Sequence, residues 1–221
     1  VLGSRGLGDV YKRQRKIEVY ALLGAVEWGY EEDGATLLAH LEKIVQYNVQ
    51  SSEKEKFDGV MLDIEPYISD SWKENPEEYM DRYISCMKKG YKFAQKNHLR
   101  TAICIPRHYD NQGLTSGLEE LIKETCDEVA VMNYSCGNEI EAIRTEAALS
   151  EKYGKELHCI LEFQEVGKHG LTENKTYRNK GIDNAKETWE KLQKEYKNIN
   201  VTRDYHWSRP VREMLEEKNA D

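Results

Sequence analysis

The stretch that decides the fold is residues 57–67, Phe57-Asp58-Gly59-Val60-Met61-Leu62-Asp63-Ile64-Glu65-Pro66-Tyr67. Side chains alternate between the two faces of a strand, so Met61, Asp63 and Glu65 share one face and the aliphatic residues between them share the other. Acids are costly to bury unpaired, and α/β proteins bind ligands at the exposed carboxyl ends of parallel strands. Pro66 then ends the ladder, because it has no N–H to donate. The stretch therefore predicts a strand that delivers two carboxylates to a pocket.

The same order of segments recurs on both sides of this stretch: a short apolar run, a polar break, and a charged segment with helical periodicity. Strands are predicted at residues 16–24, 57–65, 99–106, 127–134, 157–163 and 199–207. Helices are predicted at residues 33–47, from Asn75-Pro76 onward, at 115–126, 138–153 and 183–196, and after Pro210. Strands that alternate with helices at this spacing imply crossover connections and a parallel sheet.

Two architectures fit this alternation, an open doubly wound sheet and the larger part of a (β/α)8 barrel. No glycine-rich phosphate fingerprint follows any predicted strand, which lowers the odds of a nucleotide-binding open sheet. Polar and aromatic residues instead cluster at the carboxyl ends of nearly all the predicted strands: Glu27, Trp28, Asp63, Glu65, Arg107, His108, Asn133, Tyr134, Glu162, Gln164, His206 and Trp207. A ring of such groups on one rim is typical of a barrel, and we favour that architecture.

Composition argues against several classes of partner. The formal net charge is −8, and lysines alternate with glutamates on helix faces, so a nucleic-acid groove is not expected. No apolar run is long enough for a membrane span. The five cysteines form no C-x-x-C pair, and Cys104 and Cys159 fall within strands as expected buried thiols. The six histidines have no metal-ligand spacing, so no metal or cofactor is expected.

The first residues are set apart from this pattern. Asp9-Val10-Tyr11-Lys12-Arg13-Gln14 resembles the translation of a transposon end used in sequencing libraries. Residues 1–14 are therefore interpreted as an assembly scar, and residues 15–221 as one partial barrel domain whose native amino terminus is missing.

Several motifs resemble the family 18 glycoside hydrolases, the chitinases and endo-β-N-acetylglucosaminidases. Asp58-Gly59-x-x-x-Asp63-x-Glu65 is similar to the signature on the family's fourth strand, and Met132-Asn133-Tyr134 to the Met-x-Tyr on its sixth. Trp207 matches a tryptophan on strand eight, and the turn at residues 24–28 is a looser match to strand three. The resemblance implies that the six strands are barrel strands three to eight.

The family's chemistry implies roles for these residues. It predicts retaining hydrolysis of β-linked N-acetylglucosamine glycans, with the substrate's acetamide as nucleophile and Glu65 as general acid/base. Asp63 would orient the acetamide N–H, and Tyr134 would bond its oxygen. Substrate contacts are expected from Trp207, Met132, Asn133, Trp28, Glu27, Glu162 and His108. The sequence departs from the family pattern at three positions, since Met61 replaces the innermost acid, Pro66 a tyrosine and Ser135 an aspartate.

Two alternatives stay open. Ile64-Glu65-Pro66 also resembles the Asn-Glu-Pro of clan A glycosidases, in which Glu162, at the end of the seventh strand, would be the nucleophile. That clan requires asparagine at the position of Ile64. A non-catalytic carbohydrate-binding barrel is the other alternative, and Met61 in place of the inner acid favours it.

Overall fold

The computed structural model describes residues 17–220, and the predicted scar at residues 1–14 lies outside them. The chain divides into two compact units. The first contains the described residues up to Ile103 together with 124–127, and the second contains 104–123 and the residues from Glu128 onward. Strand β3 (Arg100–Pro106) and helix α5 (Thr115–Thr125) each run through the boundary along the chain.

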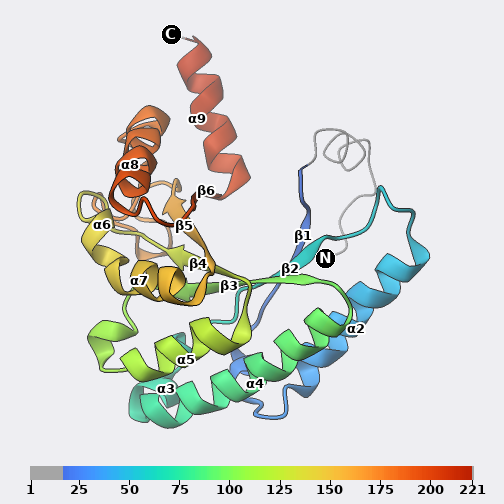
Figure 1. Ribbon diagram of the computed structural model, residues 1–221. Helices are drawn as coiled ribbons and strands as arrows, with labels where there is room; N and C mark the ends of the chain where they lie inside the picture. Colours follow the sequence, from blue (N-terminus) through green and yellow to red (C-terminus); the bar gives the residue numbers. More distant parts are fainter. Residues whose placement is uncertain (1–16, 221) are drawn as a thin grey trace. The chain divides into compact units, whose positions relative to one another are not determined.

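The first unit consists of parallel strands followed by helices (Figure 1). Strand β1 (Tyr20–Leu23) pairs with β2 (Gly59–Leu62), and β2 pairs with the first part of β3. The helices are α2 (Ala35–Gln50), α3 (Asp70–Glu74) and α4 (Pro76–Lys96), with 3-10 turns η1 (Val26–Tyr30) and η2 (Pro66–Ile68). Helices α2 and α4 pack against each other, and Pro76 opens α4 as the sequence predicts.

The Asp58-Gly59 pair has a structural reason in this unit. The Asp58 carboxylate accepts a hydrogen bond from the Val19 N–H at 2.7 Å, which fixes the start of β1 against β2. A side chain at Gly59 would place its Cβ 2.6 Å from the Arg100 carbonyl oxygen, so only glycine fits between the neighbouring strands. The pair therefore sets the register of the strand that leads to Asp63 and Glu65.

The second unit has the same construction. Strand β4 (Glu128–Met132) pairs in parallel with β5 (Glu156–Glu162), which pairs in parallel with β6 (Val201–His206). Its other elements are α6 (Glu139–Ala142), α7 (Arg144–Tyr153), α8 (Ile182–Glu195) and α9 (Ser208–Ala220), with turns η3 (Asp110–Gln112) and η4 (Lys168–Gly170). Trp189 on α8 is fully buried, and its Nε1 donates to the Cys159 carbonyl oxygen at 2.9 Å. This bond and the surrounding aromatic residues fix α8 against β5.

The observed elements confirm the α/β interpretation in its general form. Within each unit the strands are parallel and follow one another in chain order, without the reversal of order that defines a doubly wound sheet. This favours the barrel expectation, whereas closure with two further strands stays a prediction. None of the helices in the described part of the chain has the length and apolar character of a membrane span.

Several predicted boundaries are wrong. The helix predicted at residues 138–153 is two helices, because Ile143 has φ −125° and ψ 20° and interrupts it. Strand β2 ends at Leu62, so Asp63 and Glu65 follow the strand instead of belonging to it. Helix α9 begins at Ser208, before Pro210, which occupies its first turn as proline readily does.

Candidate functional site

The two acids that follow β2 lie on one face, as the sequence predicts. The alternation of the strand continues past its end, since Ile64 is buried at 1% exposure and Asp63 and Glu65 are half-buried. Glu65 caps the turn η2, and the Tyr67 hydroxyl two residues later donates a hydrogen bond to Glu65 Oε1. The structure therefore holds Glu65 by a hydrogen bond just beyond the carboxyl end of a parallel strand, two residues after Asp63.

Turn η1 brings Trp28 and Glu27 to the same end of the first unit. The Tyr30 hydroxyl donates to the Pro66 carbonyl oxygen at 3.3 Å, and Gly29 packs closely against the Pro66 ring. Trp28 is half-buried against His40, with 4.5 Å between ring centroids, and Glu27 is exposed. Trp28 is thus an ordered aromatic surface on the loop that contacts the one carrying Glu65.

A second cluster forms at the carboxyl ends of the strands in the second unit. Glu162 Oε2 accepts a hydrogen bond from His206 Nδ1 at 2.8 Å, and Glu162 Oε1 accepts from the backbone N–H groups of Phe163 and Gln164, each at 2.8 Å. The Tyr134 and His206 rings lie 5.9 Å apart. Trp207, next in the chain, is 47% exposed. The structure thus brings together the polar ends of β4, β5 and β6.

Burial and hydrogen bonds in this cluster determine the protonation state of Glu162. Burial alone would raise the pKa of Glu162, but the hydrogen bond from His206 and those from Gln164 outweigh it and lower that pKa. Glu162 is therefore an ionised carboxylate that is only 2% exposed and already accepts several hydrogen bonds. Such a group suits holding His206 in position better than attacking a substrate.

The other residues of this unit that were predicted to contact substrate differ in how deeply they are buried. Met132 and Tyr134 are half-buried at the end of β4, whereas Asn133 is 1% exposed and donates to the Glu139 carbonyl oxygen at 2.9 Å. His108 is half-buried, and burial together with the positive charge of Arg107 lowers its pKa, so its imidazole is neutral at pH 7. The acids Asp63 and Glu65 belong to the first unit and these residues to the second, and their union in one site stays a prediction.

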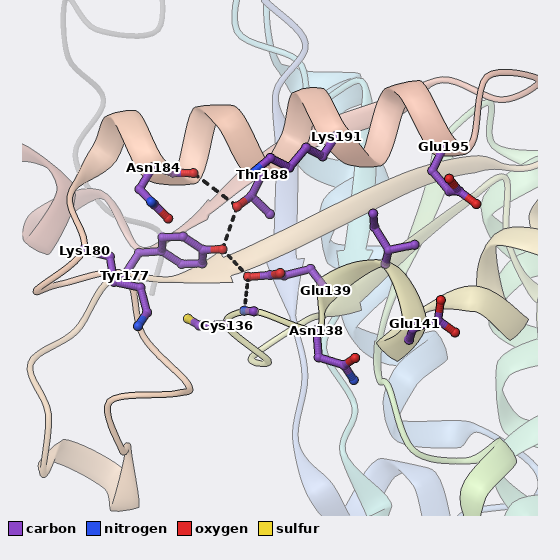
Figure 2. Close-up of a pocket in the computed structure, with 12 residues that line it drawn as sticks. Cys136, Asn138, Glu139, Glu141, Tyr177, Lys180, Asn184, Thr188, Lys191 and Glu195 are labelled. Carbon is purple, nitrogen blue, oxygen red and sulfur yellow. Dashed lines mark hydrogen bonds between the residues drawn. The ribbon is translucent and has the colours of Figure 1, made fainter.

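A cavity that the sequence did not predict lies in the loops after β4 and β5. It has a volume of about 650 Å³ and is lined by residues 136–141, Tyr177, Lys180 and the α8 residues 184, 188, 191 and 195. Figure 2 shows a chain of hydrogen bonds in it: Tyr177 donates to Glu139, which also accepts from the Gly137 N–H at 2.8 Å. Burial raises the pKa of Cys136 to about 11, so this thiol is not an activated nucleophile. The Tyr177 hydroxyl also bonds Thr188 Oγ1 at 2.8 Å, so the chain of bonds ties the loop after Tyr134 to α8.

No protein-family model matches the chain, and no curated protein matches it. The chain is similar to a chitinase domain. Catalytic domain 2 of the Group II chitinase from Ostrinia furnacalis aligns at 13% identity, and a mutant of that domain in complex with penta-N-acetylchitooctaose aligns at 14%, both with a TM-score of 0.44. Each alignment covers 76% of this chain and 52% of the other, so the chain spans about half the length of these structures.

Glu146 is a buried acid that the sequence gave no reason to notice. It lies on α7 at 0% exposure, and neither carboxylate oxygen has a hydrogen-bond partner within the described residues. Burial is the main reason that its pKa rises from 4.5 to about 7. The backbone N–H of Glu146 itself opposes this rise, Asp110 adds to it and Arg107 reduces it. Glu146 is thus a proton-binding group inside the second unit.

Stability is expected to fall as the pH rises from 5 to 8. Because the folded state holds the Glu146 proton more tightly than the unfolded state, its contribution is present below pH 4.5 and is lost as the pH passes about 7. The change corresponds to about 3 kcal/mol of unfolding free energy. Urea unfolding of Glu146→Gln across this range should show a flatter profile than wild type. The exposed Glu151→Gln is the control and should keep the wild-type slope; equal slopes in all three proteins would contradict the assignment.

Proposed function

We propose that the chain belongs to a retaining glycoside hydrolase that acts on β-linked N-acetylglucosamine glycans, with the substrate's acetamide as nucleophile. The observation that carries the proposal is the pair Asp63 and Glu65 at the end of β2, half-buried on one face, with Glu65 Oε1 bonded by Tyr67. Two half-buried carboxylates at the carboxyl end of a parallel strand, one of them held by a hydrogen bond, match the acid/base and acetamide-orienting roles that this chemistry requires.

In the proposed mechanism Glu65 gives its proton to the glycosidic oxygen as the bond from that oxygen to C1 breaks. The acetamide oxygen attacks C1 and forms a cyclic oxazolinium ion, whose N–H is held by the Asp63 carboxylate. Water then attacks C1, the bond from C1 to the acetamide oxygen breaks, and the water proton passes to the Glu65 carboxylate. This restores the acid and the acetamide and retains the anomeric configuration.

The proposal is tested by comparing aryl β-N-acetylglucosaminides, chitooligosaccharide glycosides and aryl β-glucosides as substrates. Turnover confined to substrates with the 2-acetamido group would support the mechanism, because only these carry the nucleophile. Equal turnover of glucosides would contradict it. Binding of chitooligosaccharides without release of product would favour the carbohydrate-binding alternative, for which the exposed Trp207 is the natural platform.

The clan A alternative requires Glu162 as nucleophile, and its ionised state is the observation in favour. Under our proposal Glu162→Gln should keep kcat within about tenfold of wild type, while losing about 2 kcal/mol of stability because charge-assisted hydrogen bonds are weakened. The nearby Glu165→Gln, whose carboxylate is exposed, is the control for both measurements. A loss of turnover by several orders of magnitude in Glu162→Gln alone would instead support the clan A mechanism.

A further inference from the structure

Three side chains of metal-ligand type meet at the opposite ends of the strands from Glu162. Glu128 is the first residue of β4, Glu156 is the first residue of β5, and the two are partners in the strand register. His158 lies two residues after Glu156 and therefore shares its face of β5. One ligand atom from each of the three side chains lies within 4.8 Å of the others.

The histidine of this cluster is held in the orientation that metal ligands need. His158 Nδ1 lies 3.0 Å from Asp204 Oδ2 on the neighbouring strand β6, and His158 Nε2 lies 2.9 Å from Glu128 Oε2. The side chains of Glu128 and His158 are 4% and 13% exposed, so the group is ordered by its surroundings. Metal-ligating histidines generally donate their second ring N–H to a carboxylate, which fixes the tautomer and turns the other nitrogen to the metal. Asp204 stands in that position.

We propose that Glu128, Glu156 and His158 form a binding site for one divalent transition-metal ion of the Zn²⁺ type. One imidazole nitrogen and two carboxylate oxygens suit such an ion, and a water completes the coordination. Ligands bonded at zinc distances stand about 3.3 Å apart. His158 Nε2 and Glu128 Oε2 are 2.9 Å apart and the Glu156 ligand atom lies within 4.8 Å of both, so side-chain rotations bring the three to one ion. The ion replaces the proton shared by His158 Nε2 and Glu128, and that proton passes to solvent.

The position of the site indicates its purpose. The amino ends of parallel strands in such folds support stability, whereas chemistry takes place at the carboxyl ends. An ion here joins β4 to β5 directly and fixes β6 through Asp204, so it stabilises the second unit without entering the hydrolytic reaction. The exposed side chain of Glu156 offers the entry path for the ion.

The test removes metal from the chain with a chelator and then titrates it with Zn²⁺ alone. Calorimetry measures binding, and thermal melting measures the effect of the ion on stability. We expect one ion per chain, a rise in Tm that EDTA reverses, and, with Co²⁺ as probe, visible absorption bands of a coordinated ion. Glu156→Gln removes a ligand whose side chain is exposed, and should raise the Kd for Zn²⁺ at least about tenfold. Asp204→Asn should raise it about 10- to 100-fold.

Glu187→Gln removes an exposed carboxylate elsewhere in the second unit and should bind Zn²⁺ as wild type does. The proposal is overturned if wild type fails to bind Zn²⁺ at millimolar concentration, or if Glu156→Gln and Asp204→Asn both bind with the wild-type Kd. Because these readouts are binding and Tm, they are independent of whether the chain hydrolyses any glycan.

Discussion

Glu65→Gln is expected to lower kcat for β-N-acetylglucosaminides by about 10²- to 10⁴-fold, the contribution of a positioned general acid–base. Glutamine has the size of glutamate and still accepts the hydrogen bond from Tyr67, so the loop geometry should persist. It has no acidic proton to give, and its amide cannot take one from water. The Tm should therefore stay within about 2 °C of wild type, because replacing a half-buried side chain without losing a contact has little effect on stability.

The leaving group distinguishes acid catalysis from other causes of lost activity. A dinitrophenyl group departs without protonation, so Glu65→Gln should lose much less in kcat/KM with this substrate than with methylumbelliferyl glycosides. The exposed Glu74→Gln in the same unit is the control and should retain full activity with both. Equal losses for the two substrates in Glu65→Gln would mean that Glu65 does not protonate the leaving oxygen.

Much of this arrangement could be predicted from local sequence patterns. Period-two alternation placed Asp63 and Glu65 on one face, and it survives beyond the end of β2 because Ile64 and Pro66 remain buried on the other face. Strands β1 to β5 are found where short apolar runs occur, since burying apolar side chains stabilises these segments. The break at Ile143 could not be predicted, because no proline or glycine marks it. Ile143 is fully buried, and tertiary packing overrides helix propensity there.

The interactions that the sequence did not reveal join residues far apart in the chain. His158 is bonded by Asp204 and Glu128 from two different strands, and the two hydrogen bonds and charges outweigh burial and raise its pKa to about 9. A lone histidine in a strand carries no sign of such partners. Glu146 is equally unremarkable in sequence, because an acid on a charged helix normally faces solvent. Only the packing of α7 shows that it is buried.

Gly24→Ala is expected to destabilise the chain by more than about 3 kcal/mol, beyond the usual cost of overpacking. A Cβ at this position would lie 1.8 Å from the carbonyl oxygen of Asp63 and 2.5 Å from its carbonyl carbon. The added Cβ would collide with backbone atoms, which cannot rotate away as a side chain can. The Asp63 N–H donates to the Leu23 carbonyl oxygen at 2.8 Å, so neither segment can move without breaking the pairing of β1 with β2. Urea unfolding, or the yield of folded protein where the loss is complete, measures the effect.

Gly90→Ala is the matched control, because it adds the same methyl group to a buried position of the same unit. Its Cβ would lie 2.5 Å from Leu37 Cδ2, the end of a flexible side chain that can rotate away. The helix propensity gained in α4, about 1 kcal/mol, offsets the cost of that rotation, so stability should change by less than about 1 kcal/mol. A Gly24→Ala protein as stable as Gly90→Ala would show that the close approach of β1 to Asp63 is absent. If Gly24→Ala retains a folded population, its kcat should fall along with its stability, because the displaced backbone is the one that aims the Asp63 carboxylate.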